Sequence, residues 1–294
     1  MTTTLHAFPD EEEPAQRLAQ ALGLPLALVD THHFPDGELL PRTPPPSPTT
    51  LVYRSLAQPN EKLIELLLAA EAWRRNGAQR LVLVAPYLCY MRQDAAFSTG
   101  EPISQKVVAD LLDRTFDRIV TVDPHLHRTT RLSDIFPRAE CTHLHGADAL
   151  VIYLRRTSAT LELVVGPDVE SDSWVRRIAE PLGASHLTMT KHRQGDAKVA
   201  ISAPSDFPVA GRSILIADDI CSSGATLRAA TRIARSAGAT SVTVFVTHML
   251  SGEDVLRDIL AAGADRVIST DSCRHSTNQV LLADLLAGSL RKEL

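Results

Sequence analysis

Short apolar runs alternate along this chain with longer segments whose apolar residues recur at helical spacing. The apolar positions between residues 63 and 70 predict a helix that ends at Gly77. The run "RLVLVAP" (80–86) that follows is too short for a helix and is typical of a buried strand. Strands that alternate with helices in this way predict parallel sheets with helices on both faces, which is an α/β fold.

Both halves of the chain repeat the order of strand, polar loop, helix and strand. In the first half, Ile103, Val107 and Leu111 form an apolar stripe on a second predicted helix. In the second half, a helix is expected to turn Leu227 and Ala230 inward, and the strand "SVTVFVTHM" comes after it. The repetition indicates two related domains.

We place these domains at residues 1–145 and 146–294, with the boundary near "CTHLHGAD". The last helix of the second domain has the option of packing back on the first. The proline-rich stretch "PRTPPPSPTT" (41–50) cannot continue a helix or a central strand, so we expect a loop between two strands.

Composition excludes several classes of protein. The net charge of −5 argues against a general electrostatic grip on nucleic acid. No apolar stretch approaches the roughly 20 residues that cross a bilayer, so no membrane partner is expected. The N-terminal stretch "MTTTLHAFPDEEEP" is acidic and lacks a signal region, and the four cysteines form no CxxC pair. We therefore expect a cytoplasmic protein.

The segment "ILIADDICSSGATL" (214–227) places two carboxylates and a run of small residues between a strand and a helix. In a parallel sheet, ligands collect beyond the carboxyl ends of the strands. Residues 222–226 would offer backbone N–H groups to an anion such as phosphate, at the start of a helix. Asp218 and Asp219 suit sugar hydroxyls, directly or through a cation. A ribose 5-phosphate group fits this combination.

An ordinary connection from strand to helix is the alternative for this loop. Ser222 or Ser223 would then be the helix N-cap, and the two aspartates would be solvated. The loop alone leaves the two interpretations at about even odds. A Walker-type phosphate loop is excluded, because the sequence contains no G-x-x-x-x-G-K-[ST] motif.

Motifs along nearly the whole chain, in a consistent order, identify a family. The loop resembles the phosphoribosyl-diphosphate (PRPP) loop of type I phosphoribosyltransferases and of ribose-phosphate diphosphokinase, or PRPP synthetase. Six further segments resemble segments of the synthetase only, and they occur in the same order along both chains. They are "FPDGE" (34–38), "YMRQD" (90–94), "FSTGEPIS" (97–104), "VDPH" (122–125), "VVGPD" (164–168) and "KHR" (191–193). The form of these motifs resembles the compact archaeal-type branch.

The resemblance implies two tandem phosphoribosyltransferase-like domains, with the ATP side and oligomer contacts in 1–145 and the ribose 5-phosphate side in 146–294. It implies Mg²⁺-dependent transfer of the diphosphoryl group of ATP to the 1-hydroxyl of ribose 5-phosphate, giving AMP and PRPP for nucleotide and amino-acid biosynthesis. Lys191 would be the catalytic lysine and Arg193 its partner, on an arm whose residues 194–196 could close as a flap.

By the same resemblance, His125 and Asp168 are the magnesium-linked residues. Carboxylate is a natural partner for magnesium, whereas imidazole is less usual and often acts through water. Asp123 precedes His125 by two residues, and we expect it on the same strand face. Two ordinary strand-end histidines, or a zinc site without convincing further ligands, are the alternatives for His125 and His127.

The resemblance assigns Arg92 and Gln93 to ATP. The segment that holds Phe34, Asp36 and Glu38 would come from a neighbouring subunit, so the site implies a homo-oligomer built from dimers, with a hexamer as one option. Taken alone, Pro-Asp-Gly in this segment is simply a strong turn signal.

Some residues depart from the family pattern. The ribose 5-phosphate loop is assigned to Asp218, Asp219, Ser222, Ser223, Gly224, Ala225 and Thr226. Ser222 stands where many synthetases carry an acid, and Ala225 replaces a common glycine, which demands a compatible backbone angle. Residues 95–97, "AAF", lack the basic residues of many relatives.

Two other functions stay open at this point. A phosphoribosyltransferase that consumes PRPP would account for the loop 218–226 but would leave the N-terminal motifs without a purpose. A catalytically silent homologue that binds nucleotide and regulates a true synthetase is opposed by the presence of Lys191, Arg193, His125 and Asp168.

Overall fold

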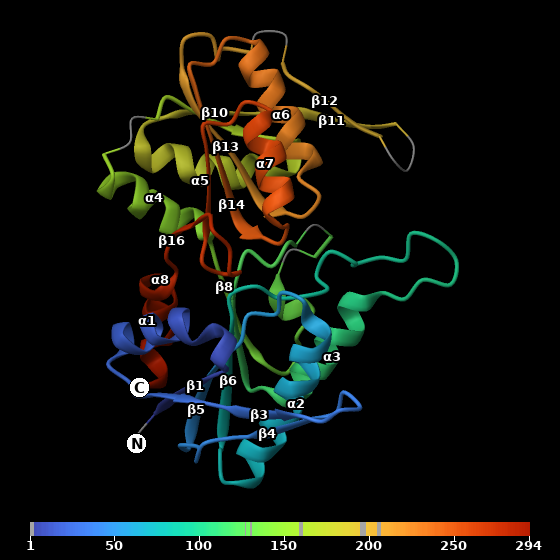
Figure 1. Cartoon of the computed structure of the whole chain (residues 1–294), viewed down its shortest axis with the longest axis vertical. Helices are drawn as coiled ribbons and strands as arrows, with labels where there is room; N and C mark the ends of the chain where they lie inside the picture. The colour runs from blue at the N-terminus through green and yellow to red at the C-terminus, as the bar shows by residue number, and fades with distance from the viewer. Residues whose placement is uncertain (1–2, 127, 130, 159–160, 195–197, 205–206) are drawn as a thin grey trace. The chain divides into compact units, whose positions relative to one another are not determined.

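The computed structural model describes residues 3–126, 128–129, 131–158, 161–194, 198–204 and 207–294, with only the backbone for 191–194 and 198–200. The chain divides into two compact units (Figure 1). Unit 1 comprises Met1–Leu144 with Leu282–Leu294, and unit 2 comprises His145–Leu281. Each unit is an α/β structure around one parallel sheet, so the predicted fold class is confirmed.

Unit 1 is built on a six-stranded sheet in the order β2-β1-β5-β6-β7-β8, in which every neighbouring pair is parallel. A separate antiparallel hairpin, β3–β4, extends from it. Its strands are β1 (Thr4–Ala7), β2 (Leu26–Leu28), β3 (Asp30–His33), β4 (Leu39–Arg42), β5 (Thr49–Tyr53), β6 (Arg80–Ala85), β7 (Arg118–Val122) and β8 (Glu140–Leu144). Its helices are α1 (Glu12–Leu22), α2 (Pro59–Arg75), α3 (Ser104–Thr115) and α8 (Ala283–Leu290), with short 3-10 turns at Pro9–Glu11, Leu132–Asp134 and Arg291–Glu293.

Unit 2 repeats this strand order in a second six-stranded sheet, β10-β9-β13-β14-β15-β16, again parallel throughout. Figure 1 shows the antiparallel pair β11–β12 projecting from unit 2 as an arm. The strands are β9 (Leu163–Gly166), β10 (Ser185–Thr188), β11 (Thr190–Gln194), β12 (Lys198–Ser202), β13 (Ser213–Cys221), β14 (Ser241–Met249), β15 (Arg266–Thr270) and β16 (Asn278–Val280). The helices are α4 (Gly146–Arg156), α5 (Asp172–Leu182), α6 (Ala225–Ser236) and α7 (Glu253–Ala261), with a 3-10 turn at Val169–Ser171.

Hydrophobic periodicity predicted several of these elements. The helix that ends before Gly77 is α2. Residues 43–48 of the proline-rich stretch form the loop from β4 to β5, as expected, but residues 41–42 and 49–50 belong to those two strands. Leu227 and Ala230 are buried on α6. The stripe expected on α3 is wrong as a core face, because Val107 and Leu111 are 58% and 42% exposed.

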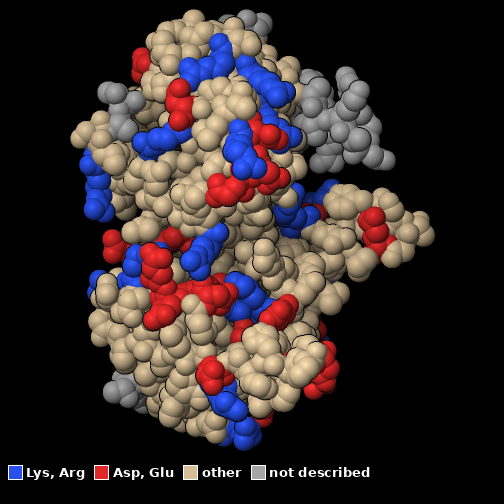
Figure 2. All heavy atoms as spheres, viewed as in Figure 1, with Lys and Arg blue, Asp and Glu red and all other residues tan. Residues whose placement is uncertain are grey.

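The buried face of α3 lies one residue further along, at Val108, Ala109 and Leu112. Both sets recur at helical spacing, so spacing alone could not tell them apart. In the described part of the chain, no helix is both long and apolar enough to cross a membrane. On the face in Figure 2, the coloured basic and acidic side chains lie interspersed rather than separated by sign.

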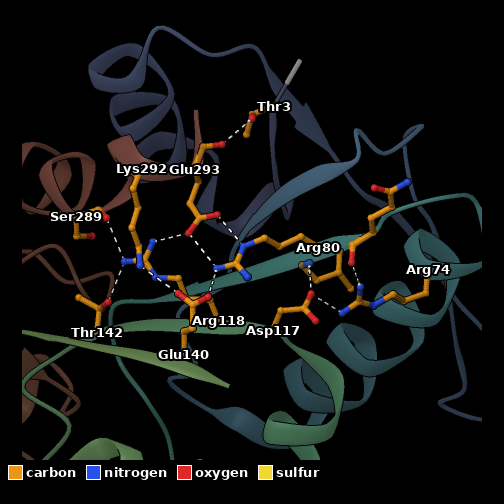
Figure 3. A network of polar contacts seen from close by, with 12 residues as sticks. Thr3, Arg74, Arg80, Asp117, Arg118, Glu140, Thr142, Ser289, Lys292 and Glu293 are labelled. Atoms are coloured by element: carbon orange, nitrogen blue, oxygen red, sulfur yellow. Dashed lines mark hydrogen bonds and ion pairs between the residues drawn. The ribbon is translucent and has the colours of Figure 1, made fainter. Parts of the chain in front are cut away.

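The C-terminal segment of unit 1 is tied to the amino ends of its strands by buried charges (Figure 3). The Glu293 carboxylate accepts hydrogen bonds from Arg80 at 2.8 Å and from Arg118 at 2.8 Å. The side chains of Glu293 and Arg118 are only 6% and 2% exposed. Burial acts to raise the pKa of Glu293, but the hydrogen bonds from Arg80 and Arg118 outweigh it and lower that pKa. The last residues of the chain are therefore part of the unit 1 fold.

Replacing Glu293 by glutamine removes the negative partner of buried Arg118. We expect the free energy of unfolding at pH 7 to fall by about 2 kcal/mol, measured by urea denaturation with circular dichroism. A group with a lowered pKa stabilises above its ordinary pKa, 4.5 here, and loses that effect as the pH falls through the lowered value. The free energies of unfolding of the parent and the variant should therefore converge as the pH falls through the lowered pKa.

The matched control is Glu140→Gln, which removes an exposed carboxylate that pairs with the same Arg80 at 2.9 Å. An exposed pair of this kind contributes less than about 1 kcal/mol. Equal losses of unfolding free energy in the two variants would contradict the conclusion that the buried ion pair contributes more than the exposed one.

Candidate functional site

In unit 2, the strand order predicts a crevice for a ligand where the sheet changes its winding direction. Strand β9 is paired with β10 on one side and with β13 on the other, so the connections that follow β9 and β13 leave in opposite directions. Open α/β sheets bind ligands at the carboxyl ends of such a strand pair. Asp168 lies two residues past the end of β9, and Asp218 and Asp219 lie near the end of β13. Three predicted site residues thus meet at this edge.

The carboxylates of this crevice repel one another. Burial, the charge of Asp219 and the charge of Asp168 raise the pKa of Asp218 well above its ordinary value, in that order of importance. Asp218 Oδ1 accepts a hydrogen bond from the Asp219 backbone N–H at 3.0 Å, which opposes the shift only in part. A half-buried carboxylate in such surroundings favours a proton or a cation. The donor set, all carboxylate oxygen, suits Mg²⁺.

The backbone holds Asp168 in a fixed orientation. Its Oδ1 atom accepts from the Glu170 N–H at 3.1 Å, and its carbonyl accepts from the Ser171 hydroxyl at 2.6 Å. A Cβ atom on Gly166 would lie 2.1 Å from Ser171 Oγ, so only glycine allows this turn to pack against β9. This tight turn fixes the position of Asp168 just beyond the end of β9.

The loop after β13 is shaped as an anion cradle. Helix α6 begins at Ala225 with Gly224 as its N-cap, so neither serine has the N-cap position that the alternative interpretation required. Gly224 has φ +68°, and a Cβ there would lie 2.4 Å from Val255 Cγ1. In this fully described loop, the N–H groups of Ser222, Ser223 and Gly224 donate to no protein acceptor. Free amides at a helix N-terminus suit a phosphate.

The substitution of alanine for a common glycine at position 225 is compatible with this loop. Ala225 is not among the described non-glycine residues with positive φ. The left-handed conformation falls on Gly224 instead, where no side chain has to be accommodated. The backbone donors of the loop are thus retained.

In unit 1, strained backbone marks the loops that follow β6 and β7. Tyr90, Asp123 and His125 have φ values of 61°, 37° and 54°. Non-glycine residues in this region cost of order 1 kcal/mol or more and cluster at functional sites. Strand β7 ends at Val122, so the prediction that Asp123 and His125 share a strand face is wrong. Their side chains are directed by the irregular backbone.

Asp123 and His125 differ in their surroundings. Asp123 is buried, its N–H donates to the Leu144 carbonyl at 2.9 Å, and its Oδ1 lies 3.7 Å from His143 Nε2. His125 is half-buried. A carboxylate beside an imidazole, as in Asp123 and His143, suits a metal, and His127 lies outside the described residues.

The predicted ATP residues of the β6 loop are held in different ways. Gln93 accepts a hydrogen bond from the Ser104 hydroxyl at 2.6 Å, while Arg92 is exposed. Arg128, from the β7 loop, pairs with the buried Asp94 carboxylate at 2.7 Å and lies over the Phe97 ring at 5.6 Å. Sequence reasoning missed Arg128, because its position 34 residues away gives no local signal. It brings a cation to the "AAF" loop.

The segment 34–38 is the turn of the β3–β4 hairpin, as its Pro-Asp-Gly signal predicted. Gly37 has φ +93°, and Asp36 Oδ1 accepts from the Glu38 N–H at 3.2 Å. Phe34 is 39% exposed and meets His32 edge to face, with ring centroids 4.6 Å apart. An exposed aromatic at the tip of a hairpin suits contact with a ligand or a second chain.

The predicted catalytic pair lies on the arm of unit 2. Lys191 pairs with Ile201, and Arg193 pairs with Val199, in the antiparallel register of β11 and β12. The side chains of Lys191 and Arg193, with the flap residues Gly195 and Asp196, lie outside the described part.

Comparison with known proteins gives two family-model matches. Residues 4–115 match the N-terminal domain of ribose phosphate pyrophosphokinase, and residues 146–262 match the phosphoribosyl transferase domain.

Whole-chain relatives agree with the family models. The ribose-phosphate pyrophosphokinase of Methanopyrus kandleri is 32% identical over 275 residues, covering 92% of this chain and 93% of that protein. That of Methanothermobacter thermautotrophicus is 32% identical over 280 residues, covering 94% and 96%. The crystal structure of phosphoribosylpyrophosphate synthetase from Mycobacterium smegmatis matches with a TM-score of 0.83 at 26% identity, covering 100% and 99% of the two chains.

Asp218→Asn should stabilise the protein while impairing its site. The amide retains the acceptor for the Asp219 N–H but removes a half-buried charge that Asp219 and Asp168 repel. Because the pKa of Asp218 is raised in the folded state, the penalty begins where the unfolded chain ionises, near pH 3.8. It grows until the pH passes the raised pKa, and it is absent below pH 3.8. Thermal unfolding at pH 8 should show a gain on the order of 1 kcal/mol.

Asp265→Asn is the control of opposite sign. Burial acts to raise the pKa of Asp265, but the Val242 N–H and Arg235 outweigh it and lower that pKa, so the amide should destabilise at pH 8. A lower melting temperature for Asp218→Asn at pH 8 would contradict the repulsion assigned to the crevice.

Proposed function

The chain belongs to the ribose-phosphate pyrophosphokinase family, and we propose that it transfers the diphosphoryl group of ATP to the 1-hydroxyl of ribose 5-phosphate. PRPP and AMP are the products. The observation that carries this proposal is the unit 2 crevice, where free loop amides lie beside a carboxylate cluster. A phosphate beside sugar hydroxyls is complementary to that arrangement.

Each part of the crevice has a role toward ribose 5-phosphate. The amides of the loop formed by Ser222, Ser223, Gly224, Ala225 and Thr226 bind the 5-phosphate, where the α6 dipole favours negative charge. Asp218 and Asp219 accept hydrogen bonds from ribose hydroxyls or bind a cation that bridges them. The 1-hydroxyl is thereby directed away from the cradle.

The reaction forms a bond between the 1-oxygen of ribose 5-phosphate and the β-phosphorus of ATP. The bond between that phosphorus and the oxygen bridging to the α-phosphate breaks, AMP leaves with the electron pair, and the hydroxyl proton is lost. Negative charge grows on the transferred group, so positioning and cations are the main requirements. We assign Lys191 and Arg193 on the arm to this charge.

Mg²⁺ fits the residues present. We propose Asp168 and His125 as magnesium-linked residues, each in its own unit, and Asp168 offers an oriented carboxylate. When bound, the ion neutralises diphosphate oxygens. The raised pKa of Asp218 indicates a cluster that gains from a nearby cation.

ATP is assigned to the loops of unit 1 and to the hairpin of a second copy of the chain. Arg92 is exposed and free to engage phosphate, and Gln93 is held by Ser104 to face the base. Phe34 would stack on adenine, with Asp36 and Glu38 accepting from its amino group or from the ribose. The active form is then a homo-oligomer.

The direct test is formation of AMP and PRPP from ATP, ribose 5-phosphate and Mg²⁺. We expect turnover by the parent and a loss of at least about 1000-fold in kcat for Lys191→Ala, because a cation at the transferred group acts in the transition state. Binding of ribose 5-phosphate, measured by calorimetry, should survive in the variant. A parent that binds ribose 5-phosphate but releases no AMP would refute the proposal and point to the silent homologue; consumption of PRPP with a base would point to the transferase.

Subunit complementation tests whether the site spans two chains. Phe34→Ala should raise the KM for ATP about tenfold or more, through lost stacking. Phe34→Ala and Lys191→Ala chains, mixed and allowed to exchange, should regain about a quarter of parental activity at low ATP. This follows because half the dimers are mixed and each has one intact site. Activity no greater than the sum of the separate variants would place Phe34 in the same chain's site.

A further inference from the structure

Arg228, one turn into α6, reaches back to the loop 222–226, which we call the anion loop. Its Nη1 atom donates to the Ser223 carbonyl at 3.0 Å and lies 3.1 Å from Asp258 Oδ2 on α7. The Arg228 side chain is 26% exposed. Its own backbone N–H donates to the Gly224 carbonyl at 2.9 Å. Arg228 therefore donates hydrogen bonds to two successive carbonyl groups of the loop, one from its side chain and one from its backbone.

The hydrogen bond from Arg228 to the Ser223 carbonyl sets the orientation of the neighbouring Gly224 N–H. The Ser223 carbonyl and the Gly224 N–H belong to one planar, trans peptide unit, in which the two groups point in opposite directions. Holding the carbonyl against Arg228 therefore turns the Gly224 N–H away from Arg228. That N–H donates to no protein acceptor in this described loop, so it is available to an anion.

Gly224 makes such control necessary. Glycine populates positive and negative φ about equally, so the peptide between residues 223 and 224 can rotate at little steric cost. Rotation would present a carbonyl, and not an N–H, to the phosphate. The guanidinium of Arg228 prevents this, because a bond from a charged donor is stronger than one from a neutral donor.

Asp258 fixes the guanidinium in turn and offsets its charge. The pair is partly exposed, with Asp258 on the outer side of α7. A neutralised arginine contributes little long-range attraction for anions, and its effect is carried by the hydrogen bond to Ser223.

We propose that Arg228 is a positioning residue for ribose 5-phosphate, which orients the Gly224 amide by clamping the Ser223 carbonyl. The inference rests on the proposed function of the loop as the 5-phosphate site. In this arrangement a side chain fixes the peptide orientation in the loop, which would otherwise depend on backbone conformational preference alone.

The test compares Arg228→Ala, Arg228→Lys and Arg228→Gln with the parent. Calorimetry gives Kd for ribose 5-phosphate and for inorganic phosphate, and kinetics give KM for ribose 5-phosphate and for ATP. We expect Arg228→Ala to raise the Kd and KM for ribose 5-phosphate about tenfold while the KM for ATP and kcat change less than about threefold. Lysine and glutamine, which still offer an N–H donor, should each restore part of the loss.

Two control variants separate clamping from charge. Arg232→Ala removes an exposed arginine one turn further along α6, and Asp258→Asn removes the partner of Arg228 while leaving the Ser223 contact. Each should change the Kd for ribose 5-phosphate less than about threefold. Equal losses in Arg228→Ala and Arg232→Ala, or glutamine as weak as alanine, would show that charge alone acts and would overturn the proposal.

The remaining outcomes distinguish this inference from the proposed function. Unchanged binding in a folded Arg228→Ala chain overturns the inference and leaves the proposed function intact. A parent that binds ribose 5-phosphate without forming AMP overturns the proposed reaction and leaves the Arg228 comparison valid. A parent that binds neither ribose 5-phosphate nor phosphate overturns both.

Discussion

The change of winding direction beside the first strand of each sheet is the constraint on which the rest of the structure depends. In each unit the second strand of the main sheet pairs on one side of the first, and the third pairs on the other. A crevice must therefore open at the carboxyl ends of the first and third strands, because the connections there diverge. In unit 2 this places Asp168 beside the end of β13 and its anion loop. The strand order therefore determines which side chains lie close together at this edge of the sheet.

The two units use the equivalent crevice in opposite ways. In unit 1, Arg54 follows β5 and is 4% exposed, and it pairs with Asp10 at 2.5 Å and with Glu65. Lys62 adds a second cation, 2.8 Å from the buried Glu11 carboxylate, whose pKa burial raises. These ion pairs place the side chains of unit 1 itself at the carboxyl ends of β1 and β5.

Sequence reasoning succeeded where local signals agreed with long-range packing. The helices α2 and α6, the strands around them and the hairpin turn at 34–38 follow from periodicity and turn residues. It failed for the α3 stripe, since two helical faces carried apolar residues, and for the expected strand face at Asp123, where positive φ ends the strand. The concern over Ala225 was resolved by a backbone angle that composition does not encode.

The sequence by itself determined the α/β class, the family and the residue types available at each strand end, because these depend on short-range periodicity and on ordered motifs. Only the tertiary structure decided which strands are neighbours and which distant side chains support the loops. Arg128 reaches Asp94, and Arg228 holds the Ser223 carbonyl. Such contacts depend on the packing of separate elements, on strained φ values and on single peptide orientations, none of which leaves a periodic signal in the sequence.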